Sequence, residues 1–107
     1  MKRLVTYVTL AALLGASSCV PNYSTYNLLN GSLQRSPEGR LVYTISLEKK
    51  RGSSCDTINI NVTGPERELM RIHGQNKKKD VEVMVTVEEP IRPAMNLNYV
   101  SFEEWPR

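Results

Sequence analysis

The chain is short and carries a small positive charge. Its 107 residues, 40% of them hydrophobic, are enough for one small domain, which buries only about 60% of the surface that the unfolded chain exposes. The formal net charge is +3, but two of the 14 basic residues, Lys2 and Arg3, stand at the N-terminus, and the other 12 nearly balance 11 acidic residues. The charge therefore gives little support for a nucleic-acid partner, and we expect none.

The first 18 residues have the pattern of a secretory signal peptide. A cationic start is followed by the apolar run LVTYVTLAALL and then by the small residues Gly15–Ser18. The run is shorter than the about 20 apolar residues that a membrane-spanning helix needs, which argues against a retained anchor. We therefore expect residues 1–18 to be removed during export.

Cys19 follows the small residues at once, so that GASSC resembles the lipobox of bacterial lipoprotein precursors. In that class the cysteine becomes the new N-terminus and carries the lipid, which implies lipidation of Cys19. The next residue is Val20 and not Asp, and by the same resemblance this implies the periplasmic face of the outer membrane. An ordinary secretory signal, cleaved near Ala16, is the alternative.

The expected state of the second cysteine, Cys55, depends on whether Cys19 carries a lipid. If a lipid occupies the sulfur of Cys19, Cys55 is an odd thiol in an oxidising compartment, and we expect it to be buried or paired with another chain. If Cys19 carries no lipid, a Cys19–Cys55 disulfide becomes possible. Lipidation and this disulfide exclude one another.

Residues 19–39 are rich in Ser, Asn, Pro and Gly and lack sustained periodicity. This composition predicts a flexible, lipid-bearing tether. Four apolar residues interrupt it, and they form either a short first strand or a segment that folds against a partner: Tyr23, Tyr26, Leu28 and Leu29.

Residues 40–107 alternate between apolar and polar side chains. The alternation predicts strands over residues 40–49, 56–63, 80–89 and 95–102, and the clearest of them places four valines on one face. Residues 66–73 suit either one turn of helix or a third strand. We favour a strand from Leu69 to His73, because Gly74–Lys79 suits a hairpin connection.

These elements predict an all-β domain, a small antiparallel β-sandwich or barrel of four to six strands behind the tether. A single alternating sheet leaves one apolar face uncovered. The sheet must therefore close on itself or be covered by a partner.

No motif in the chain carries chemistry. His73 is the only histidine, and together with Cys55 it falls short of the four N/S ligands of a structural zinc site. We therefore expect no catalytic residues, no cofactor and no metal.

Two runs of basic residues fall at expected turns: Lys49, Lys50 and Arg51, and Lys77, Lys78 and Lys79. They could contact anionic head groups or an acidic partner. We favour the simpler interpretation that they solvate turns and guard strand edges, because no aromatic residue is interleaved with either run.

These features together favour a non-enzymatic outer-membrane lipoprotein, an accessory or assembly subunit of a secretion or conjugation apparatus that docks on a protein partner by strand addition. One alternative is a lipid-anchored periplasmic binding or inhibitor module. Another is a eukaryotic or viral secreted glycoprotein, suggested by sequons at Asn22, Asn30 and Asn61.

Overall fold

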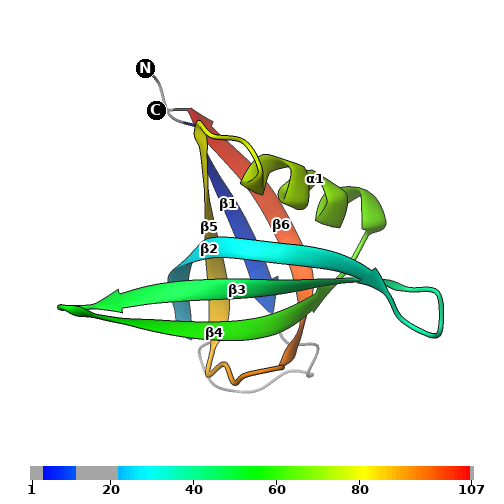
Figure 1. The fold of residues 1–107 in the computed structure, drawn as a ribbon, viewed down its shortest axis with the longest axis horizontal. Coiled ribbons are helices and arrows are strands. Elements are labelled where there is room, and N and C mark those ends of the chain that lie inside the picture. The colour runs from blue at the N-terminus through cyan, green and yellow to red at the C-terminus, as the bar shows by residue number, and fades with distance from the viewer. Residues whose placement is uncertain (1–3, 12–21, 107) are drawn as a thin grey trace.

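The computed structural model describes residues 4–11 and 22–106, which form six strands and one helix. The elements are β1 (Leu4–Ala11), β2 (Asn22–Arg35), β3 (Leu41–Arg51), β4 (Ser54–Thr63), α1 (Glu66–Asn76), β5 (Val81–Glu89) and β6 (Asn96–Pro106). The strands close into a barrel in the order β1-β5-β2-β3-β4-β6 (Figure 1). The predicted all-β barrel is confirmed, and closure covers the apolar face of the sheet.

The sheet is mixed and not wholly antiparallel as expected. β1 pairs with β5 in parallel, and β4 pairs with β6 in parallel. The other four pairings in the barrel are antiparallel. Alternation along a strand shows which side chains share a face, but it carries no information on the direction of the neighbouring strand.

The barrel interior is filled by the alternating apolar residues. On β3 the predicted inward face is buried throughout, and on β5 the three residues Val83, Val85 and Val87 are each at most 2% exposed. They form one cluster with buried residues of β2, β4 and β6. The prediction of which side chains face inward is therefore confirmed for these strands.

Residues 66–76 form a helix, so the strand expected from Leu69 to His73 is wrong. Leu69 and Ile72, three residues apart, are buried in the core, whereas Met70 is 58% exposed. A strand would have placed Met70 and Ile72 on the same face. Pro65 precedes the helix, and two glutamates in its first turn lie at the positive end of the helix dipole. Helix α1 packs against β2 and β5 (Figure 1).

The expected tether is also wrong for residues 22–35, which form β2. The first part of this strand pairs with β5 over Asn22–Asn27, and the remainder pairs with β3 as far as Arg35. Asn27 pairs on both sides, and a register shift between Leu28 and Asn30 interrupts the pairing with β3. Of the four apolar residues within the polar composition, Tyr26 and Leu28 are buried in the core, whereas Tyr23 and Leu29 are exposed.

The described part of the expected signal peptide, Leu4–Ala11, forms β1. In the full-length chain this strand lies between β5 and β6 and completes the barrel. Removal of residues 1–18 from an exported protein stays a prediction, and Cys19 lies outside the described residues.

Candidate functional site

The position of β1 is the feature of the fold that bears most directly on docking by strand addition. Seven residues, Leu4–Leu10, pair with Val81–Val87 of β5, and the other side of the strand pairs with β6. Without β1 the remaining strands run β5-β2-β3-β4-β6, with two unpaired edges facing one another. We call the space that β1 occupies between β5 and β6 the β1 slot.

The inward side chains of β1 are Thr6, Val8 and Leu10, and none is more than 2% exposed. They stand opposite Val83, Val85 and Val87 of β5. The hydroxyl of Thr6 is buried and has no hydrogen-bond partner among the described residues. Leaving such a group unsatisfied costs about 1–3 kcal/mol, so β1 is an imperfect occupant of the slot at this position.

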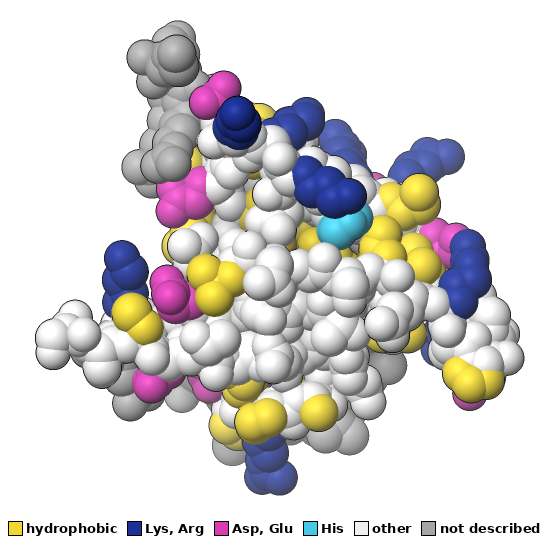
Figure 2. Space-filling view, in the orientation of Figure 1, with side chains coloured by type: hydrophobic (Ala, Val, Ile, Leu, Met, Phe, Trp, Pro, Cys, Tyr) yellow, Lys and Arg dark blue, Asp and Glu magenta, His cyan; other side chains and the backbone are white. Residues whose placement is uncertain are grey.

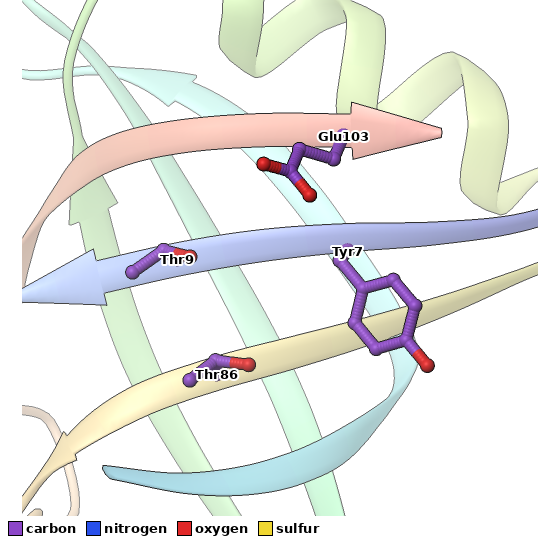
Figure 3. Close-up of a pocket in the computed structure, with 4 residues that line it drawn as sticks. All are labelled: Tyr7, Thr9, Thr86 and Glu103. Carbon is purple, nitrogen blue, oxygen red and sulfur yellow. The ribbon is translucent and has the colours of Figure 1, made fainter. Parts of the chain in front are cut away.

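The outward side of β1 contributes to an open hollow of about 370 Å³. Figure 3 shows its four labelled residues on three neighbouring strands, Tyr7 and Thr9 on β1, Thr86 on β5 and Glu103 on β6. Two hydroxyls, a phenol and a carboxylate suit a small hydrogen-bonding ligand. Sequence reasoning missed this hollow because residues 4–11 were assigned to a signal peptide.

A second hollow of about 370 Å³ lies where β2, β3 and β5 meet. It is lined by Thr25, Asn27, Glu48, Lys49, Lys50, Glu82 and Met84. The ammonium group of Lys49 lies 5.5 Å from the centre of the Tyr26 ring, within the range of a cation–π contact. Carboxylates and ammonium groups line this hollow together, so Lys49 and Lys50 do not form a purely basic surface.

The first basic run lies on a strand and not in a turn, because β3 continues to Arg51. The second run, Lys77 to Lys79, follows α1, with Lys77 at the helix C-cap. A cation at that position is favoured by the helix dipole, which accounts for Lys77 but not for Lys78 and Lys79. The tip of the β3–β4 hairpin and the α1–β5 connection lie at separate places on the molecule (Figure 1).

Cys55 is exposed and has no disulfide partner among the described residues. It stands on β4 opposite Lys50 of β3, near the tip of the hairpin. The expectation that Cys55 is buried is therefore wrong for this chain. Pairing with another chain stays a prediction, as does lipidation of Cys19 or its pairing with Cys55.

His73 lies on α1, not at a strand end, and is half-buried. Its Nδ1 is 3.3 Å from the hydroxyl oxygen of Tyr43, and the two rings meet edge to face. Burial lowers the pKa of His73, and the nearby charge of Lys77 lowers it further. Burial raises the pKa of Tyr43 to about 12. The pair therefore joins α1 to β3 as neutral groups at pH 7.

No group of three or more His, Cys, Asp or Glu side chains suited to a metal occurs within residues 4–11 and 22–106. Nor does that part of the chain contain a helix that is both long and apolar enough to cross a bilayer. No family model, curated protein or solved structure matches the chain. The β1 slot and the two hollows are the features of the described structure that bear on function.

Figure 2 shows that charged side chains of both signs are spread over one face of the molecule, with apolar side chains scattered between them. Four large apolar residues are strongly exposed in the described chain: Tyr23, Leu29, Met70 and Val100. They come from β2, α1 and β6. None of the four lines either hollow.

Proposed function

We propose that the protein is a non-enzymatic, lipid-anchored accessory or assembly subunit of a bacterial envelope complex, held at the periplasmic face of the outer membrane through Cys19. The supporting observation is that residues 4–11, which fall within the apolar run of the predicted signal peptide, form one strand of the barrel. Processing before Cys19 would remove this strand and leave unpaired edges on β5 and β6. Such edges are templates for pairing with another protein.

The short distance from Cys19 to the barrel supports a defined orientation. Strand β2 begins at Asn22, only three residues after Cys19, and a chain spans at most about 3.5 Å per residue. The lipid would therefore hold the start of β2 within roughly 10 Å of the attachment point. Asn22 pairs with Glu89 at the end of β5, so this end of the barrel would face the membrane.

The second basic run lies at the opposite end of the barrel. Lys77, Lys78 and Lys79 precede the start of β5, while the lipid would sit near the end of β5. In this orientation the run points away from the outer membrane. Contact with lipid head groups is therefore disfavoured for this run, and an acidic protein surface is the partner that its position allows.

Intact mass of the protein isolated from bacterial membranes tests the proposal. We expect the mass of residues 19–107 plus a diacylglyceryl group and one further acyl chain. The matched control is Cys19→Ser, which should lose the lipid mass and the membrane attachment. A mass equal to residues 1–107, or to an unmodified secreted chain, would overturn the anchor. Purification without any stoichiometric protein partner would argue against the role as a subunit.

A second candidate function, the binding module, is favoured by the two hollows. The hollow lined by Tyr7 and Thr9 needs β1, whereas the hollow lined by Lys49 and Lys50 uses only β2, β3 and β5. Only the latter would survive removal of residues 1–18. If the lipid-anchored protein binds a small ligand in this hollow, Lys49→Ala should abolish the binding. Thr86→Ala, which alters only the other hollow, should leave the binding unchanged.

The glycoprotein alternative receives uneven support from the three sequons. Asn22 and Asn30 are exposed. The amide of Asn61 instead accepts a hydrogen bond from the Thr44 hydroxyl at 3.0 Å and donates one to the Ala94 carbonyl at 3.5 Å. A glycan on Asn61 would disrupt these bonds, so this site is poorly suited to modification.

A further inference from the structure

We infer that the β1 slot is a receptor site for a strand of another envelope protein, and that β1 takes the place of this strand in the unprocessed chain. The inference rests on the proposed function, because the slot opens only when residues 1–18 are removed. The pairing of β1 also defines where the partner strand binds, in which direction it runs and which side chains it carries.

The pairing of β1 fixes the direction and length of the occupant. β1 runs parallel to β5 and antiparallel to β6, and it pairs over seven residues with the former and eight with the latter. A partner strand in the slot satisfies the backbone N–H and C=O groups of both edges at once. A strand that is added to the edge of an open sheet satisfies the backbone groups of one edge only.

The side chains of the slot define what the occupant must carry. Val83, Val85 and Val87 of β5 line one wall, and Phe102 of β6 stands opposite Val8 on the other side. The strand must therefore present apolar side chains at three alternate positions. Thr6 meets this demand poorly because its buried hydroxyl has no hydrogen-bond partner among the described residues, so a strand with Val at this position should bind more tightly.

Direct closure of β5 on β6 is a poor substitute for a partner strand. Adjacent strands lie about 4.8 Å apart, so loss of β1 leaves two edges separated by roughly 10 Å. Closing this gap would also displace the side chains that pack against Val8 and Leu10. The core of the remaining strands is therefore close-packed only when a sixth strand fills the slot.

A second copy of the chain is also a poor occupant. After processing, the residues before β2 are Cys19–Pro21, which are too few to fill seven paired positions. Every other strand of a second copy is already paired in its own barrel. Its β2, β3 and β4 have two neighbours each, and its opened edges β5 and β6 keep one neighbour each, so neither of them can pair with both edges of the slot at once. The occupant is therefore a strand of a different protein with alternating apolar residues.

Strand exchange in the full-length chain tests this inference. A protease recognition sequence is inserted between Leu14 and Gly15. Cleavage there breaks the covalent link between β1 and the rest of the chain but leaves β1 bound in the slot. A fluorescent peptide with the sequence of residues 2–12 is then added in excess, and uptake is followed by fluorescence anisotropy. We expect one labelled peptide per cleaved chain and none in the uncleaved chain.

Peptide variants locate the binding in the slot. Val8→Asn places an amide in the core and should weaken uptake by about a hundredfold or more, whereas Thr9→Asn places the same group outside and should change it little. Thr6→Val should strengthen uptake by about fivefold or more. Equal uptake of the Val8→Asn and Thr9→Asn peptides would overturn the inference.

Two further outcomes would also overturn it. The freed segment could leave while the remaining chain still melts cooperatively and takes up no peptide, which would show that β5 closes on β6. The remaining chain could instead form a dimer that takes up no peptide, which would place a second copy in the slot. The intact mass from membranes tests processing independently, so failure of the slot and failure of the lipid anchor are distinguishable.

Discussion

The ring of Tyr43 occupies the space into which any side chain on Gly31 would project. Its Cε1 lies 2.5 Å from the position of a Cβ built on Gly31, and its hydroxyl oxygen lies 2.8 Å from the same point. Gly31 is on β2 next to the register shift, and Tyr43 is a buried residue of β3 that also contacts His73. The absence of a side chain at residue 31 therefore lets the ring pack beneath β2.

We predict that Gly31→Ala destabilises the full-length chain by about 1–3 kcal/mol, because the added methyl group must displace a buried ring. The matched control is Gly74→Ala in α1, where a Cβ meets nothing within 4 Å. That substitution should stabilise by about 0.5–1 kcal/mol through helix propensity. Urea unfolding measures both, and equal stability of Gly31→Ala and the parent chain would contradict the close contact.

Thr6→Val should stabilise the full-length chain by about 1 kcal/mol, because it removes a buried hydroxyl that has no partner among the described residues while keeping the shape of the side chain. Thr9→Val, on the outward face of the same strand, should change the stability little. Thermal melting of the two variants provides the comparison. A loss of stability in Thr6→Val would show that the hydroxyl is hydrogen-bonded.

The stability should fall as the pH drops below 6.5. Burial and the charge of Lys77 lower the pKa of His73, so the unfolded chain binds this proton more readily than the folded chain does. The contribution of neutral His73 to the free energy of unfolding is complete above the ordinary pKa of 6.5. It is lost as the pH falls through that value towards the lower pKa of the folded state.

The check for His73 is the difference in urea midpoint between about pH 7.5 and about pH 5.5, which should be smaller in His73→Gln than in the parent chain. An NMR titration of the single histidine measures its pKa directly. A pKa at or above 6.5 in the folded protein would contradict the prediction.

Cys55 should react with a thiol reagent as quickly in the folded protein as in urea, because its side chain is exposed near the hairpin tip. The measurement uses Cys19→Ser, in which Cys55 is the only thiol, and Cys55→Ser provides the blank. Slow reaction in buffer that becomes fast in urea would show that the thiol is protected in the fold.

Much of the barrel could be predicted because alternation is strong on β3 and β5. Burying one face of such a strand leaves a period of two in the sequence, and the residues predicted to face inward, such as Val85 and Leu47, are buried. The parallel pairings could not be predicted in this way. They depend on which strands meet after the chain has crossed the barrel through α1, a long-range relationship that leaves no local pattern.

The helix and the full length of β2 were weighed only as a single helical turn and a short strand, and neither was favoured, for different reasons. At residues 66–73 the apolar positions are too few to separate a period of 3.6 from one of two, and tertiary packing of Leu69 and Ile72 decides the outcome. In β2 the Ser, Asn, Pro and Gly content of residues 19–39 suggested a flexible tether. Gly31 is required there because of the ring of Tyr43, which lies 12 residues further along the chain.

The two neighbours of β1 are the last two strands of the chain to be synthesised. Residues 4–11 leave the ribosome first, but Val81–Glu89 and Asn96–Pro106 follow only after most of the chain has been made. At about 5–20 residues per second, that delay is on the order of 5–20 s. For this interval the apolar N-terminal segment lacks both of its neighbouring strands and stays accessible to other proteins. If the chain is exported as proposed, barrel closure competes with export for the same eight residues once translation ends, and the timing of binding to an export receptor decides between the two outcomes.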